Sequence, residues 1–130
     1  MTGTVGTVLV LFCLLQVKHM FADYFMQTPR MLSGRGEYWH LGRAQHAGLH
    51  ALGSAIAFLI VGTPLAFTVI IVALEWVVHF NIDWGKARYC DGKHLGPGDA
   101  AFWRAAGFDQ LLHQLTYLAM IWAWVGFAAG

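Results

Sequence analysis

The sequence has few charged residues for its length. Only 12% of its 130 residues are Asp, Glu, Lys or Arg, whereas 58% are hydrophobic. A soluble domain carries about 25% charged residues, so the composition excludes an ordinary water-soluble fold and favours a protein of the lipid bilayer. The formal net charge of +1 gives no bulk electrostatic preference for nucleic acid, and we expect no nucleic-acid partner.

Cysteine is also scarce. Cys13 lies in an apolar segment and Cys90 in a polar connection, so neither a disulfide framework nor a CxxC metal site is indicated. The sequence lacks a nucleophile elbow, a phosphate-binding loop and a dinucleotide fingerprint, which leaves covalent and nucleotide chemistry without support. The first apolar run has no basic segment before it and no small-residue cleavage site, so we expect a retained helix rather than a signal peptide.

Long apolar runs are what the sequence has in abundance. Crossing a bilayer takes about 20 apolar residues per helix, and backbone groups inside hydrocarbon must be hydrogen-bonded within their own segment. The alternating pattern of a membrane β-barrel is absent. We therefore predict an all-α polytopic membrane protein, a single transmembrane domain over residues 1–130. It is expected to be an up-down-up-down bundle of four helices at about 4–27, 43–61, 65–86 and 108–127.

The basic residues lie on one side of these predicted spans. All eight Lys and Arg residues fall in or beside the two longer connections, 29–42 and 87–107. The short turn Gly62–Pro64 and both chain ends carry no charged side chain. The positive-inside rule then predicts an inner (cytoplasmic) membrane protein with both long connections in the cytoplasm and both termini outside.

Each predicted span carries two potential metal ligands four residues apart, and this spacing puts both on one helix face. In an up-down-up-down bundle, all four pairs come to the same membrane face. The pairs are His19 and Asp23, His46 and His50, His79 and Asp83, and Asp109 and His113. Ionisable groups in a bilayer are costly unless they are paired, hydrated or bound to an ion. Imidazole and carboxylate are ligands of zinc, manganese and iron, so the pattern predicts a divalent-metal site near the cytoplasmic face.

Further polar residues lie close to these pairs. Glu75 shares the helix face of the third pair, deeper in the predicted span, and is the candidate general base or an additional ligand. Gln27 and Gln110 adjoin the candidate ligands and are expected to orient them. Lys18 and Lys86 are expected to extend toward lipid phosphates.

The pattern leaves several functions open. A metal with a free coordination position activates water, which predicts a metal-dependent hydrolase acting on a lipid-borne phosphate or ester. The same residues also suit a hydrogen-bonded network that only fixes helix packing, or a proton or ion path. The alternative is thus a non-enzymatic membrane module, either a scaffold or a small transporter. Haem ligation by two histidines is a third reading, which the neighbouring carboxylates disfavour.

Small residues at Gly53, Ser54 and Ala57 give the second predicted span a face suited to close helix contact. The contact can lie within the bundle or between copies in a homo-oligomer, and the sequence does not distinguish the two.

The ordered set of motifs resembles a family of small bacterial and phage membrane proteins whose domain is classed as of unknown function. The resemblance covers nearly the whole chain. It is carried by HMFADYFMQ at 19–27, His46, His50, HFNIDWGK at 79–86 and DQLLH at 109–113. It implies a four-helix membrane protein and supplies no activity.

A looser similarity links His19, Asp23 and Gln27 to a ligand motif of helical zinc-dependent phospholipases C and nucleases. In that motif, proline directly follows the glutamine, whereas Pro29 here is displaced by one residue. The chain also lacks the amino-terminal tryptophan ligand of that group and is too short for its three-metal site. This similarity is an analogy between motifs and not between folds.

Overall fold

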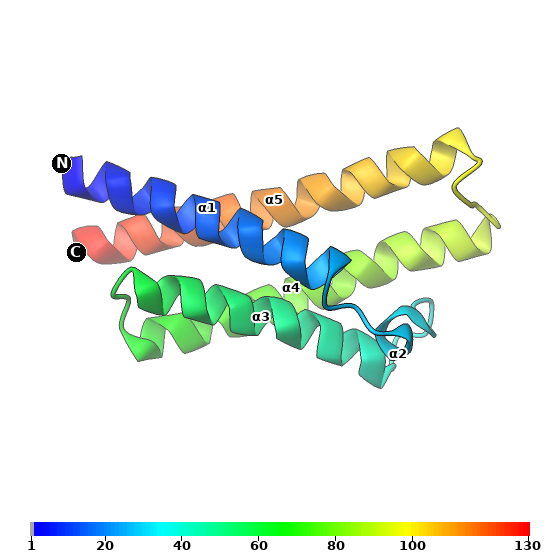
Figure 1. The fold of residues 1–130 in the computed structure, drawn as a ribbon, viewed down its shortest axis with the longest axis horizontal. Helices are drawn as coiled ribbons and strands as arrows, with labels where there is room; N and C mark the ends of the chain where they lie inside the picture. Colours follow the sequence, from blue (N-terminus) through cyan, green and yellow to red (C-terminus); the bar gives the residue numbers. More distant parts are fainter. Residues whose placement is uncertain (1) are drawn as a thin grey trace.

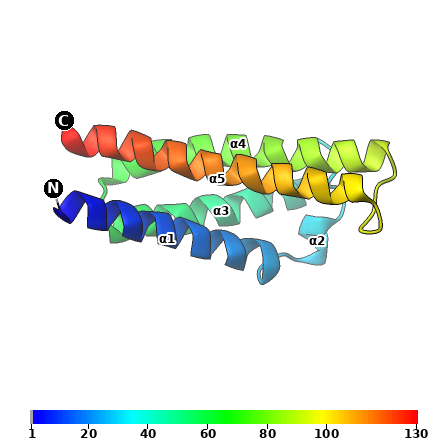
Figure 2. The same ribbon diagram turned by 90° about the horizontal axis from the view of Figure 1, so that it is seen from above.

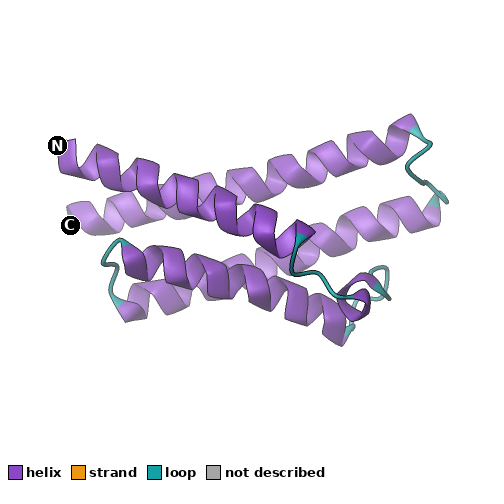
Figure 3. Ribbon diagram, in the orientation of Figure 1, coloured by secondary structure: helices purple, strands orange, loops and turns teal. Residues whose placement is uncertain are grey.

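A computed structural model describes residues 2–130 of the chain, with side chains from residue 4 onward. The described residues contain helices and connections and no strand (Figure 3), which confirms the all-α prediction. The number of helices is five rather than the expected four. They are α1 (Thr2–Tyr24), α2 (Pro29–Leu32), α3 (Leu41–Ile60), α4 (Leu65–Gly92) and α5 (Ala100–Ala129).

The additional helix, α2, is a single turn inside the first long connection. Thr28 is its N-cap and accepts a hydrogen bond from the Met31 backbone N–H through Oγ1 at 3.3 Å. Pro29 follows at the first helical position, where its missing N–H removes no hydrogen bond. Thr28 and Pro29 were interpreted from sequence only as the end of the first span, whereas they also begin a new helix.

The four long helices form an antiparallel bundle (Figures 1 and 2). α1 packs against α3 and α5, and α4 packs against the same two helices, so the contacts close into a ring. Both termini and the predicted Gly62–Pro64 turn lie at one end of the bundle, and α2 and the α4–α5 connection lie at the other (Figure 1). These are called the terminal end and the loop end below. Gly62 has a φ of +78°, which glycine adopts without strain.

The helix boundaries at the loop end differ from the sequence prediction. α4 continues six residues past the expected end at 86, and α5 begins eight residues before the expected start at 108. The expected connection 87–107 therefore shrinks to 93–99, and Cys90 lies buried in α4 rather than in a connection. Alanine and arginine, frequent in these extensions, are strong helix formers even where hydropathy is low. α1 ends three residues early, at Tyr24.

Three of the described helices are long and apolar enough to cross a membrane: the α1 segment Thr4–Tyr24, α4 and α5. α3 has sufficient length, but polar residues lower its hydropathy. Most of those polar residues, including His46 and His50, are buried and Gln45 is exposed, while Leu52 and Ile56 on its outside are 60% and 52% exposed. Apolar side chains outside and ionisable side chains inside reverse the pattern of a water-soluble bundle.

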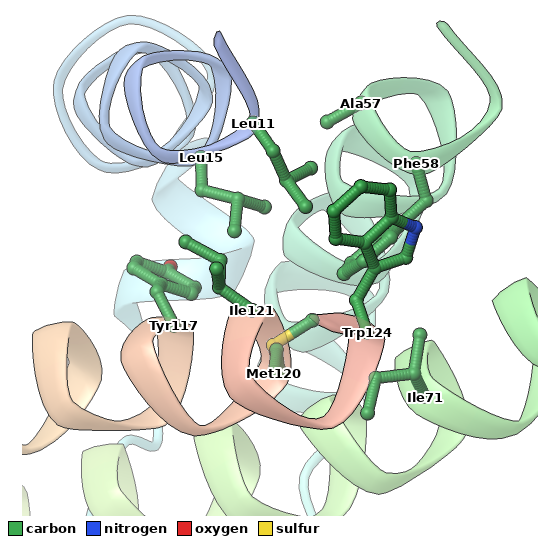
Figure 4. Packing of buried hydrophobic residues seen from close by; sticks show 9 residues of the cluster. All are labelled: Leu11, Leu15, Ala57, Phe58, Ile71, Tyr117, Met120, Ile121 and Trp124. Carbon is green, nitrogen blue, oxygen red and sulfur yellow. The ribbon is translucent and has the colours of Figure 1, made fainter. Parts of the chain in front are cut away.

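The terminal-end half of the bundle holds the apolar core, which Figure 4 shows at close range. Leu11, Leu15 and Phe58 are fully buried there, packed with α5 side chains around Trp124. Trp124 Nε1 donates a hydrogen bond to Thr63 Oγ1 at 2.8 Å and thereby ties α5 to the α3–α4 turn. This core fixes the helix spacing from which the polar half extends.

Leu11 and Leu9 provide a matched test of this core, because Leu11 is fully buried and Leu9 is 59% exposed on the same helix. Leu11→Ala removes packed methyl groups and leaves a cavity, so we expect the free energy of unfolding to fall by about 2–5 kcal/mol. Leu9→Ala is expected to lower it by less than about 1 kcal/mol. Thermal unfolding in detergent, followed by circular dichroism, measures both, and equal losses would contradict the placement of the core.

Candidate metal centre

Asp23, near the end of α1, lies within reach of three imidazoles. Its Oδ1 is 3.0 Å from His50 Nε2 and 3.2 Å from His46 Nε2, both on α3. Its Oδ2 is 3.1 Å from His19 Nε2, one turn earlier on α1. The four-residue spacing predicted on α1 and on α3 thus places His19, His46 and His50 around the carboxylate of Asp23.

Asp83 on α4 has the same arrangement on the other side of the cluster. Its Oδ1 is 3.1 Å from His113 Nε2 of α5, and its Oδ2 is 3.2 Å from His79 Nε2, one turn earlier on α4. Asp83 Oδ2 also lies 3.5 Å from His46 Nε2. His46 therefore touches both carboxylates and joins the two sets into one cluster.

Seven of the eight predicted ligands form groups of three whose potential ligand atoms lie within 4.8 Å of one another. The groups are His19, Asp23 and His50; His79, Asp83 and His113; and His46, His50 and His79. Two donors on opposite sides of a zinc ion are at most about 4.4 Å apart, so small side-chain rotations suffice to close each group on an ion. The first two groups share no residue, which leaves room for two ions.

Several nitrogens in this cluster are buried without a hydrogen bond. His79 is only 1% exposed; its Nε2 contacts Asp83 Oδ2 at 3.2 Å, whereas its Nδ1 has no hydrogen-bond partner among the described residues. His46 Nδ1 is in the same situation. Buried polar atoms are almost always hydrogen-bonded, and a lone pair on a buried imidazole nitrogen is suited to a metal ion. The Nδ1 atoms of His46 and His79 are therefore the buried nitrogens of the cluster that can still take a ligand.

Asp109, the eighth predicted ligand, lies beside the cluster and in none of the three groups. Its Oδ1 is 3.6 Å from His113 Nε2, and its Oδ2 is 3.6 Å from Lys86 Nζ. Lys86 was expected to extend toward lipid phosphates, but the nearby carboxylate gives it a partner within the bundle. Asp109 is positioned to orient His113 and to neutralise Lys86.

A cavity of about 750 Å³ opens onto the cluster from the loop end. Asp23, His46 and Asp83 lie on its wall, together with Arg35 from the connection after α2. Arg35 Nη2 donates a hydrogen bond to Gln27 Oε1 at 2.8 Å, and Gln27 Nε2 lies 3.5 Å from His46 Nε2. Gln27 thus links the connection to the cluster, as its place in the sequence suggested. This cavity gives ions, water and polar groups a route to His46 and to the two carboxylates.

The family model described as "Protein of unknown function (DUF3307)" matches residues 10–129. The chain belongs to the DUF3307 family. This confirms the resemblance to a domain of unknown function, and the matched region contains every candidate ligand. Comparison with curated proteins finds no match, and comparison with solved structures finds none either.

Arg43 fixes the wall of the cavity in this DUF3307 domain. It is 4% exposed and donates hydrogen bonds to the backbone carbonyls of Glu37, Tyr38 and Phe80. The sequence analysis counted Arg43 only as one of the positive charges. The hydrogen bonds of Arg43 hold the connection after α2 against α4.

Tyr117 is a site residue that the sequence analysis missed. Its hydroxyl lies 2.8 Å from His19 Nδ1, while Gln110 Oε1 lies 3.0 Å from His19 Nε2. Tyr117 follows His113 by four residues and shares its helix face, so the spacing rule that selected His113 also reaches it. A search for imidazole and carboxylate pairs does not include tyrosine, which is a less usual metal ligand.

Glu75 lies on the side of the cluster toward the apolar core and forms an ion pair with Lys18. Lys18 Nζ is 2.5 Å from Glu75 Oε1 and donates a further hydrogen bond to the His50 carbonyl at 3.1 Å. The expectation that Lys18 extends toward lipid phosphates is therefore wrong: its side chain is only 11% exposed. The fully buried carboxylate of Glu75, on α4 across the bundle from α1, is the counter-ion of the Lys18 ammonium.

The Lys18–Glu75 pair can be tested by removing one charge and then both. Lys18→Met leaves a buried carboxylate without a partner, so we expect the free energy of unfolding to fall by about 3–5 kcal/mol. The double variant Lys18→Met/Glu75→Gln is expected to recover most of that loss. Thermal unfolding of the two variants in the same detergent decides the point, and a single variant as stable as the wild type would show that the charges are not paired.

Proposed function

We propose that this protein spans the inner membrane, holds divalent metal in the His/Asp cluster near the cytoplasmic face, and uses it to hydrolyse a lipid-borne phosphate or ester. The single observation that carries the metal proposal is the convergence of His79, Asp83 and His113, whose potential ligand atoms lie within 4.8 Å of one another. The three apolar helices support the membrane location.

In this proposal α3 is the fourth span, in an up-down-up-down arrangement. Its arginine and both of its histidines are buried, and its exposed side chains are apolar except for Gln45 near the loop end, so it can cross hydrocarbon without exposing charge. The Lys and Arg residues gather toward the loop end, and the positive-inside rule then places that end in the cytoplasm and the termini outside.

The two groups without a shared residue define the proposed ligands. One ion is held by His19, Asp23 and His50, and the second by His79, Asp83 and His113, with His46 between them. Imidazole and carboxylate donors suit zinc, manganese or iron. Three protein ligands leave a position for water, and a metal lowers the pKa of bound water toward about 7.

Glu75 stays a prediction as general base. Lys18 holds one of its carboxylate oxygens, while the other, Oε2, is buried with no hydrogen-bond partner among the described residues. This free oxygen is the one that would accept a proton from an activated water.

The direction of access favours hydrolysis over transport. The cavity approaches the cluster from the loop end, whereas the opposite side is filled by the apolar core around Leu11, Leu15 and Phe58. The buried Lys18–Glu75 pair is the observation in favour of the alternative, a small proton or ion transporter. Proton uptake into vesicles that contain the protein would select that alternative.

Metal analysis of the purified protein tests the metal proposal. We expect about two divalent ions per chain in the wild type, because two separate three-ligand groups are available. Asp83→Asn and His113→Ala each remove a ligand and should lose the second ion, while His94→Ala, an exposed histidine of the connection, should retain both. Elemental analysis after gel filtration gives the ratio, and a folded wild type free of stoichiometric metal would contradict the proposal.

Hydrolysis is tested with protein reconstituted in phospholipid vesicles. Metal-loaded wild type should release phosphate or fatty acid at a rate at least about 100-fold above the chelator-treated protein, since the metal generates the nucleophile. Colorimetric phosphate detection and mass spectrometry of the lipids monitor both products. If loaded and stripped protein leave the lipids equally intact, the metal has another role.

A further inference from the structure

A second cavity, of about 830 Å³, lies between α4 and α5 on the outside of the bundle. Its wall is mainly apolar, with Val77, Ile82 and Leu112 toward the middle of the bundle and Ala101 and Ala105 toward the loop end. Gly85 also lines it, and a Cβ added to Gly85 would meet no atom within 4 Å. Small residues facing one another thus leave a groove where two larger side chains would have filled the space. We call it the α4–α5 groove.

The α4–α5 groove and the polar cavity over the cluster share two wall residues, Lys86 and Asp109. Their ion pair, at 3.6 Å, therefore forms a common border. At this border a mainly apolar groove on the outside of the bundle adjoins a polar cavity lined by Asp83 and His46. A lipid matches this arrangement, because its apolar chain suits the groove and its polar headgroup suits the adjoining polar cavity.

The length and charge of the groove fit one leaflet. Its α4 wall runs from Val77 to Tyr89, about 18 Å at 1.5 Å per helical residue. Half of a bilayer core is about 15 Å thick. Arg104 lines the groove from α5 at the loop end, where its positive charge favours an anionic lipid.

We propose that the α4–α5 groove binds one acyl chain of an anionic membrane phospholipid while the headgroup enters the polar cavity over the metal centre. This rests on the proposed metal function and names its substrate class.

The charge of the polar cavity makes headgroup binding depend on metal. Five acidic side chains and three basic ones line it, so the empty cavity is net negative and attracts cations. Two divalent ions reverse that sign, and a phosphate then completes the coordination of the metal. Lys86 and Arg88 on the same wall add to the attraction. Selectivity for anionic over zwitterionic lipid is therefore expected only for the metal-loaded protein.

Gly85→Trp tests the groove by filling it from α4, and Ala105→Trp fills it independently from α5. The matched control is Gly107→Trp, a glycine of α5 that also has open space around it but does not line the groove. Full-length, metal-loaded protein is placed in phosphatidylcholine vesicles with a trace of phosphatidylglycerol spin-labelled on its acyl chain. Electron paramagnetic resonance gives the motionally restricted fraction, and elemental analysis gives the metal content of each variant.

We expect both groove variants to weaken phosphatidylglycerol association about tenfold, the loss of roughly 60 Å² of apolar contact, with metal content unchanged. Gly107→Trp should behave as the wild type, and chelation should abolish the preference for phosphatidylglycerol over phosphatidylcholine. Unchanged lipid association in both groove variants would overturn the groove while leaving the metal centre intact. A wild type without metal that still selects phosphatidylglycerol would overturn the metal-dependent headgroup site. If the variants instead separate a dimer and leave lipid association unchanged, the groove is an interface between copies and the proposal is wrong.

Discussion

Two carboxylates, Asp23 and Asp83, lie between the helices where burial would make an isolated negative charge very costly. Five imidazoles surround them, and the four long helices all contribute: α1 and α3 to Asp23, and α3, α4 and α5 to Asp83. Since His46 touches both carboxylates, a rotation or shift of α3 would disturb both sets at once. The contacts of the five imidazoles with Asp23 and Asp83 thus constrain the rotation of each long helix about its own axis.

The bundle is divided along its length. Toward the terminal end, Leu11, Phe58 and Trp124 form an apolar core; toward the loop end, the same helices turn imidazoles and carboxylates inward. The Lys18–Glu75 ion pair lies between the two halves and holds the last charged groups before the apolar core begins. The polar cavity opens onto the cluster from the loop end, and in the proposed function it is the route by which substrate reaches the metal.

Much of the site followed from the sequence because two regular quantities determine it. Helical residues four apart share a face, and antiparallel spans alternate their ends, so His19, His46, His79 and His113 had to come to one end of the bundle. The ligand groups use seven of the eight predicted residues, while Asp109 lies just outside them. The apolar runs also identified the four long helices and the turn at Gly62.

The remaining features depend on quantities that hydropathy does not measure. The polar extensions of α4 and α5 are helical because of helix propensity and packing, whereas apolar runs end before them. Both cavities are lined in part by these extensions, so apolar runs alone do not predict the cavities. α2 arises from a single cap at Thr28. The burial of Lys18 depends on Glu75 being 57 residues away in sequence and adjacent in space, a pairing that no local pattern contains.

X-ray absorption spectroscopy of the metal-loaded protein examines the centre most directly, because it reports the atoms around the ion itself. A metal held by the two carboxylates and their imidazoles gives nitrogen and oxygen neighbours at about 2.0–2.2 Å, with the outer-shell scattering of histidine rings. That signal should weaken in a variant that lacks His79. A spectrum of water oxygens alone, or of sulfur ligands, would contradict a metal centre built from these helices.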